Sequence, residues 1–137
     1  IQVELKGFGS ENKSGVAMLV PADGVEGVKN AVLEIVKHAG PNPCPPIVLG
    51  VGIGGTMDQA AVMSKKALLR DISVPHKDAD YAKLEEEMVN KTGIGPQLGG
   101  TTTCIGVNIE WGATHIAGLP VAVTIMCHAA RHAHAEL

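Results

Sequence analysis

Three cysteines, Cys44, Cys104 and Cys127, are the side chains of this sequence best suited to bind a metal or to act as a nucleophile. Cys44 stands in the segment NPCPP, where the neighbouring prolines restrict the backbone. Cys127 ends an apolar run just before a segment that we expect to be helical, and first-turn amides of a helix favour a thiolate. Cys104 lies within an expected strand, where a cysteine is usually a small apolar core residue. Widely spaced cysteines are compatible with an iron–sulfur cluster, although spacing alone does not establish one.

Histidines offer a second kind of chemistry. His128 and His132 stand four residues apart beside Cys127, so on a helix they would share a face, a spacing that can bind zinc. Structural zinc sites usually group four ligands in pairs, so a polar face on a terminal helix is the favoured interpretation. His115 lies in the glycine-rich turn WGATHIAGLP between two expected strands. The sites of α/β proteins gather at strand ends, which makes His115 a candidate site residue.

The glycines of LGVGIGGT give a third pattern. Gly50, Gly52 and Gly55 fit the fingerprint G-x-G-x-x-G, after an apolar strand and before an expected helix, the context of a dinucleotide loop. The acidic residue that should bind the ribose falls near Asp71, where a strand is poorly supported. We therefore expect these glycines to serve close packing, with a nucleotide-binding module kept as the alternative from a different functional class.

These candidates need elements to position them. The hydrophobic spacing predicts a helix from Val25 to Ala39, stopped by Gly40-Pro41. Thr56 is an expected N-cap, with a capping box, for a helix that runs to about Arg70. Six further segments are predicted: strands at 15–23, 45–51, 99–111 and 119–127, and helices at 78–93 and 128–137. This order predicts an α/β or α+β fold, a single compact domain with a small mixed sheet flanked by helices.

Composition narrows the functional class. The 137 residues are 45% hydrophobic with one Trp, one Tyr and one Phe, so the core must be aliphatic. A net charge of −3 and the absence of basic runs argue against nucleic-acid binding. Apolar stretches are too short to span a membrane, and three cysteines without a CxxC pattern favour a reducing, cytoplasmic location. The chain opens without an initiator Met, which indicates a fragment.

Four blocks in order along the chain carry a family resemblance: KGFGSENKSGVAML, CPPIVLGVGIGGTMDQAAVMSKKALLR, TGIGPQLGGTTT and HIAGLPVAVTIMCHAARHA. Together they resemble the α region of class I fumarate hydratases. The α subunits of L-tartrate dehydratases belong to the same family of iron–sulfur hydro-lyases. The blocks are long and cover nearly all of residues 1–137, so the resemblance is far more specific than the glycine motif alone.

The resemblance implies a set of site residues. Cys44 and Cys127 match two of the three ligands of a 4Fe-4S cluster that keeps one iron open for substrate. His115 matches a histidine near the substrate, and we expect it to position the substrate or relay protons. Gly7 and Gly9 match a turn whose backbone approaches the substrate, although Phe8 replaces the expected glycine between them.

The resemblance also implies an incomplete enzyme. The third cysteine ligand and the general base are expected outside this chain, in a missing N-terminal segment or elsewhere, so residues 1–137 alone should be inactive and without a complete cluster. A β subunit or β domain should supply the cations for the substrate carboxylates, in a dimer of αβ units. The expected reaction is the reversible hydration of fumarate to (S)-malate, with tartrate dehydration as the alternative.

Overall fold

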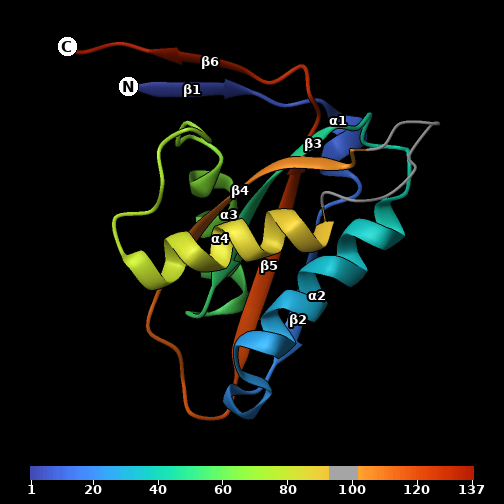
Figure 1. Ribbon diagram of the computed structural model, residues 1–137. Coiled ribbons are helices and arrows are strands. Elements are labelled where there is room, and N and C mark those ends of the chain that lie inside the picture. Colours follow the sequence, from blue (N-terminus) through green and yellow to red (C-terminus); the bar gives the residue numbers. More distant parts are fainter. Residues whose placement is uncertain (93–101) are drawn as a thin grey trace.

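The protein folds around one mixed sheet, seen in a computed structural model that describes residues 1–92 and 102–137 (Figure 1). Its strands lie in the order β2-β5-β3-β4, and their bounds are Gly15–Leu19 (β2), Leu119–Met126 (β5), Ile47–Ile53 (β3) and Cys104–Trp111 (β4). β3 pairs parallel with β4 and antiparallel with β5, while β2 pairs antiparallel with β5. The predicted α/β domain with a small mixed sheet is therefore confirmed.

The central strands are β3 and β5, as their apolar sequences predict. All seven residues of β3 are buried, as are seven of the eight residues of β5. A strand that is covered on both faces needs apolar side chains on both, and IVLGVGI meets that need without alternation. The centre of the sheet is thus almost fully buried, whereas the edge strands β2 and β4 contain exposed residues.

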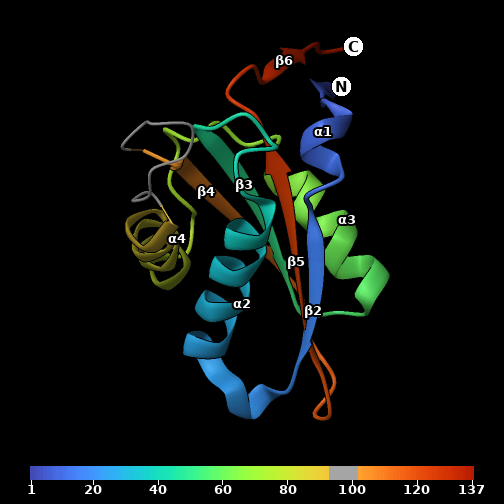
Figure 2. The ribbon, with the colours of Figure 1, turned by 90° about the vertical axis from the view of Figure 1, so that its right-hand side faces the viewer.

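Helices cover both faces of this sheet (Figure 2). α2 (Gly24–Ala39) and α4 (Ala79–Thr92) lie on one face, and α3 (Met57–Ala67) lies on the other. α2 buries Val28, Val32 and Val36, which stand four residues apart, as the predicted helical spacing requires. The core that they enter is aliphatic, as the composition predicts, with members such as Leu49 and Ile125.

α3 packs directly on the backbone of β3, because the residues beneath it are glycines. A Cβ atom at Gly50 would lie 2.0 Å from the carbonyl oxygen of Ser64, and one at Gly52 would lie 2.0 Å from that of Ala60. Neither space admits any side chain. Two glycines of the supposed dinucleotide fingerprint are therefore strand residues beneath a helix, which speaks against a phosphate loop and supports the packing interpretation.

Both ends of α3 are capped. At its N-cap Thr56, the backbone N–H donates to Gln59 Oε1 at 2.9 Å, so the predicted capping residue and box are confirmed. At the other end the buried Asn108 amide donates to the carbonyls of Ala67, at 3.1 Å, and Arg70, at 2.6 Å. The helix ends at Ala67, slightly before the predicted Arg70, because residues 68–70 continue in tighter turns, such as the bond from the Arg70 N–H to the Ala67 carbonyl at 3.3 Å.

The edge strand β4 is protected by a side chain. Glu85 of α4 accepts a hydrogen bond from the Ile109 backbone N–H at 2.7 Å and forms an ion pair with Arg70. The carboxylate thus takes the place that a neighbouring strand would fill. This contact also fixes α4 against the sheet.

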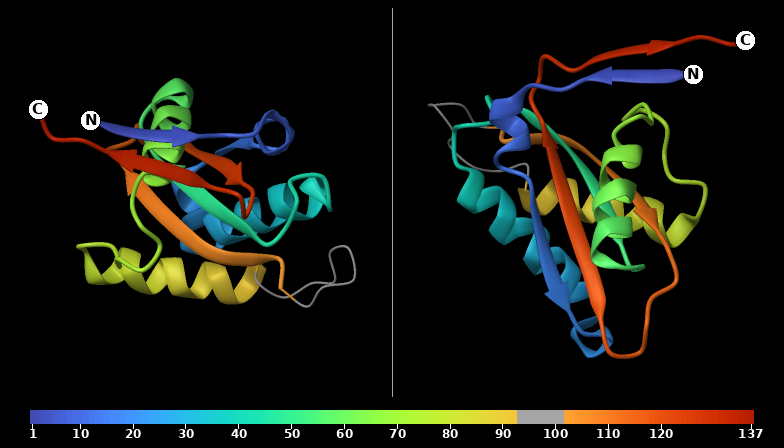
Figure 3. Two further views of the ribbon diagram at one scale, coloured as in Figure 1. Left: turned by 90° about the horizontal axis from the view of Figure 1, so that it is seen from above. Right: turned by 180° about the vertical axis from the view of Figure 1, so that it is seen from behind.

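The C-terminal residues contradict one prediction. We expected a helix at 128–137, but β6 (Arg131–His134) is a strand that pairs antiparallel with β1 (Gln2–Leu5). Pairing with a segment more than 120 residues away overrides the helical tendency of the alanines, which sequence periodicity cannot reveal. His128 and His132 therefore do not share a helix face. Figure 3 shows the two termini side by side in this ribbon.

Other differences are small. The short strand β1 and the one-turn helix α1 (Phe8–Glu11) were not predicted, and β2 ends at Leu19. Most of the block TGIGPQLGGTTT and the first part of the expected strand 99–111 lie outside the described residues. Among those described, no helix is long and apolar enough to cross a membrane.

We predict that Gly50→Ala or Gly52→Ala destabilises the protein by about 3 kcal/mol or more, because the added methyl overlaps a helix backbone that is held at both ends. Urea denaturation measures this loss. Gly118→Ala is the matched control, since its Cβ would meet no atom within 4 Å. Equal midpoints for the Gly50 and Gly118 variants would contradict the packing account.

Candidate functional site

The structure brings Cys44 and Cys127 to the same end of the sheet. In the β3–β5 pair Val48 lies opposite Met126, so the start of β3 faces the end of β5. Cys44 precedes β3 by three residues, and Cys127 directly follows β5. Cys44 is exposed and Cys127 is partly buried, so neither cysteine is enclosed in the core.

The loop that carries Cys44 holds it in an unusual conformation. Cys44 has a φ of 57°, in the left-handed region that non-glycine residues rarely adopt. Its backbone N–H donates to the Pro41 carbonyl at 3.2 Å, and its own carbonyl lies 3.0 Å from Nδ1 of His128. The loop is thus attached to the residue next to Cys127.

The glycine turn lies at this end as well. Gly7 is the N-cap of α1, and a Cβ at Gly9 would lie 3.8 Å from the Asn42 carbonyl oxygen in the Cys44 loop. A Cβ at Gly7 would meet no atom within 4 Å. The backbone of this turn is therefore open on the side of Gly7 and adjoins the Cys44 loop at Gly9.

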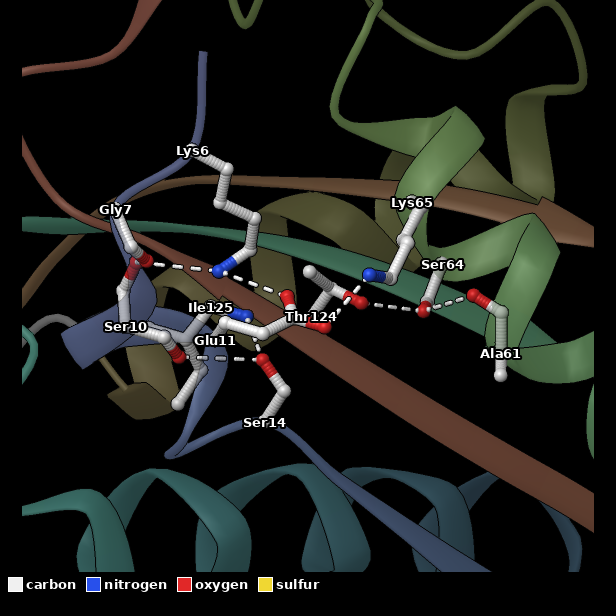
Figure 4. A network of polar contacts seen from close by, with 10 residues as sticks. All are labelled: Lys6, Gly7, Ser10, Glu11, Ser14, Ala61, Ser64, Lys65, Thr124 and Ile125. Atoms are coloured by element: carbon white, nitrogen blue, oxygen red, sulfur yellow. Dashed lines mark hydrogen bonds and ion pairs between the residues drawn. The ribbon is translucent and has the colours of Figure 1, made fainter. Parts of the chain in front are cut away.

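Hydrogen bonds fix the turn to β5, the strand that Cys127 directly follows (Figure 4). Ser10 Oγ donates to the Gly7 carbonyl at 2.9 Å and accepts from Lys6 Nζ at 3.1 Å. Ser14 Oγ lies 3.3 Å from the Ser10 carbonyl and accepts from the Ile125 N–H at 3.0 Å. β2 begins at Gly15, which pairs with Val123, so β5 extends beyond the start of β2. There the Ser14 hydroxyl accepts the hydrogen bond of the Ile125 N–H in place of a strand partner.

Charged groups reinforce the same contact. Glu11 lies 3.2 Å from Lys6 Nζ and 2.6 Å from Lys65 Nζ, so it joins α1 to α3 (Figure 4). The hydrogen bond from Lys65 is the main cause that holds the pKa of Glu11 below its usual value. Burial lowers the pKa of Lys6, which is nearly enclosed. Behind them the buried hydroxyls of Ser64 and Thr124 are 2.6 Å apart and join α3 to β5.

A cavity of about 220 Å³ opens beside Cys127. Glu4 and His132, from the paired strands β1 and β6, line it together with His128 and Met126. Burial raises the pKa of Glu4, and the nearby His132 opposes that effect at 3.6 Å. The paired strands β1 and β6 therefore form one wall of the cavity next to the Cys127 thiol.

His115 is not part of this arrangement. It lies exposed in the loop between β4 and β5, at the opposite end of the sheet. The eight residues of β5 alone separate the two ends by roughly 25 Å. Its Nδ1 accepts a hydrogen bond from the Ala117 N–H at 3.1 Å, within its own loop. The structure thus unites Cys44, Cys127, Gly7 and Gly9, but not His115.

The surroundings of Cys127 differ from those expected, whereas those of Cys104 agree with the expectation. The first-turn amides expected after Cys127 are absent, because a turn and then β6 follow it. Cys104 is buried at the start of β4, and its thiol points to the Gly106 carbonyl at 3.3 Å, in agreement with a core role. Within residues 1–92 and 102–137, no three His, Cys, Asp or Glu side chains meet to hold a metal ion.

Sequence reasoning missed the residues that assemble this end of the sheet. Lys6, Ser10 and Glu11 belong to the block KGFGSEN, where the sequence predicted a role only for the backbone of the turn. His128 was considered only as a zinc ligand together with His132 and Cys127. The proximity of His128 to Cys127 in the chain was visible, but its contact with the Cys44 carbonyl depends on the register of β3 and β5.

Comparison with known proteins agrees with this picture. The family model described as Fumarate hydratase (Fumerase) matches residues 1–136, so the chain belongs to that family. A protein of Methanocaldococcus jannaschii with the name "Putative L(+)-tartrate dehydratase subunit alpha" is 52% identical over 132 residues, which cover 93% of this chain and 46% of that protein. The L(+)-tartrate dehydratase subunit alpha of Escherichia coli K12 is 40% identical, over 100% of this chain and 48% of its own length. The chain therefore spans about half the length of these relatives.

We predict that Glu11→Gln lowers the free energy of unfolding by about 1 kcal/mol at neutral pH, since it removes the charge between two lysines. A carboxylate with a lowered folded pKa stabilises the protein above its unfolded pKa, and that stability is lost as the pH falls through the folded value. The difference between the variant and the original protein should thus shrink below about pH 4.

Chemical denaturation from pH 7 down to acid measures this difference. Glu34→Gln is the control, because its pair with Lys37 is exposed on both sides and should contribute little. A Glu11→Gln effect that is absent at pH 7, or that grows in acid, would refute the role of Glu11.

Proposed function

We propose that this chain is the cluster-binding part of a hydro-lyase that interconverts a four-carbon 2-hydroxydicarboxylate and its dehydrated product. The observation that carries the proposal is the meeting of Cys44, Cys127 and the open Gly7 turn at one end of the sheet. Membership of the fumarate hydratase family supports the reaction type.

The donor set fits an iron–sulfur cluster in part. Neither Cys44 nor Cys127 is enclosed in the core, and thiolates are the usual ligands of such clusters. A third ligand has to come from outside these residues, since Cys104 is buried with its thiol turned to a backbone carbonyl. When bound, a 4Fe-4S cluster with one open iron supplies a Lewis acid for the hydroxyl that leaves as water.

The chain itself would mainly bind and orient. The Gly7 backbone would present an open surface to a substrate carboxylate, and the Gly7 carbonyl already accepts a hydrogen bond from Ser10 Oγ. Lys6 adds a positive charge beside that turn, although Glu11 partly neutralises it. Further cationic side chains that bind the substrate carboxylates would come from a β subunit or β domain, as the name "subunit alpha" of the relatives suggests.

Two substrates are in question. The family description favours the hydration of fumarate to (S)-malate, our leading expectation from the sequence. The names of the two relatives favour L(+)-tartrate. (S)-Malate and L(+)-tartrate are both four-carbon dicarboxylates with a hydroxyl next to a carboxylate, so one site chemistry serves both reactions. We further propose a reducing compartment such as the cytoplasm, where the thiols would stay available.

The test uses the full-length protein with its β part, reconstituted anaerobically with iron and sulfide. We predict visible cluster absorbance and turnover of malate or tartrate, assayed side by side. Cys44→Ser and Cys127→Ser should each abolish both signals, because each removes a ligand. Cys104→Ser is the matched control and should keep the cluster. An unreactive protein, or one whose cluster survives loss of Cys44 and Cys127, would overturn the proposal.

His115 needs a separate account, because its distance from the thiols of its own chain excludes direct action there. We propose that the exposed loop with His115 enters the site of a second copy in the assembly. The side chain next to it, Ile116, is 86% exposed, as expected of a loop that is covered only by a neighbouring chain. This proposal agrees with the expected dimer of αβ units.

Mixed assemblies test this arrangement. Cys44→Ser and His115→Asn proteins should each be inactive, yet their co-assembled mixture should regain activity. Half of randomly formed dimers are mixed, and each mixed dimer has one intact site of two, so about a quarter of full activity is expected. A mixture as inactive as its components would show that His115 does not act across copies.

A further inference from the structure

We propose that His128 is a positioning residue that fixes the position of Cys44 relative to Cys127. The proposal rests on the proposed function in so far as these thiols are cluster ligands. It goes beyond that function because it gives a role to a side chain outside the expected ligand set.

The contact is direct at both ends. His128 is joined to Cys127 by a peptide bond, and its Nδ1 lies 3.0 Å from the backbone carbonyl oxygen of Cys44. A carbonyl oxygen can only accept, so Nδ1 must carry the proton that makes this bond. One imidazole ring therefore spans from the end of β5 to the loop before β3.

The Cys44 loop needs such an attachment. Its left-handed φ of 57° is unfavourable for a residue with a side chain, and such conformations persist only where neighbouring contacts enforce them. Cys44 is exposed, so burial does not hold it, and its bond to Pro41 lies within the loop. The bond from His128 ties that loop to the sheet and orients the peptide that follows the cysteine.

The role differs from that of a core residue. His128 is itself exposed, so its removal should alter the folding stability little while it frees the Cys44 loop. Groups that orient metal ligands typically change metal affinity by about 10- to 100-fold when they are replaced. The effect should therefore appear in the spacing of the thiols and in iron retention.

Two substitutions separate the two ring nitrogens. The side-chain amide nitrogen of Asn can take the position of Nδ1, whereas that of Gln reaches the position of Nε2. His128→Asn should thus preserve the bond to the Cys44 carbonyl, while His128→Gln and His128→Ala should lose it. His134→Ala is the control, since this histidine is exposed on the same C-terminal segment and its nearest acidic partner is 3.8 Å away.

The experiment uses the full-length protein in two states. In the iron-free state, a short bifunctional thiol reagent cross-links Cys44 to Cys127, and mass spectrometry measures the yield of the linked peptides. In the reconstituted state, iron content is followed during challenge with a chelator. We expect a roughly tenfold loss in both readouts for the Ala and Gln variants, with the Asn and His134 variants within about twofold of the original.

The outcomes are distinct. Equal cross-linking for His128→Ala and the original protein, or equal losses for the Asn and Gln variants, would overturn the positioning role. If the Ala variant does not fold by circular dichroism, the comparison of Asn with Gln decides. An original protein that cross-links as expected but binds no iron would refute the cluster and leave the positioning role of His128 standing.

Discussion

The antiparallel pairing of β3 with β5 is the constraint on which the rest of this structure depends. It sets Val48 opposite Met126, so the segment before β3 and the segment after β5 meet at one end of the sheet. Cys44 and Cys127, 83 positions apart by their residue numbers, become neighbouring groups for that reason. The same pairing sends the loop before β5, with His115, to the other end. A shift of this register would separate the thiols and unmake the site.

The packing beneath the site depends on glycine. Gly50 and Gly52 let α3 approach the strand backbone, and this approach brings Ser64 and Lys65 within reach of Thr124 and Glu11. The glycine turn, α1, α3 and β5 are thereby joined through polar contacts. A rigid support of this kind is what a ligand-binding turn requires.

Much of this could be predicted from the sequence, since local patterns govern it. The aliphatic run of β3, the spacing in α2 and the Thr56 capping box each encode their element within a few residues. The C-terminal strand could not be predicted, because β6 exists through its pairing with β1 at the other end of the chain. For the same reason the contact of His128 with Cys44 and the separation of His115 from the thiols were hidden, since both follow from the register of distant strands. The family resemblance implied Cys44, Cys127 and His115 as site residues, and the fold places the two cysteines at one end of the sheet and His115 at the other.

Crystals of the full-length protein loaded with iron would test the central claim most directly, by anomalous scattering at the iron absorption edge. The account predicts an iron signal at bonding distance from the thiols of both Cys44 and Cys127, beside the Gly7 turn, with His115 of the same chain roughly 25 Å away. Iron bound elsewhere, or beside His115 of the same chain and distant from either cysteine, would contradict it.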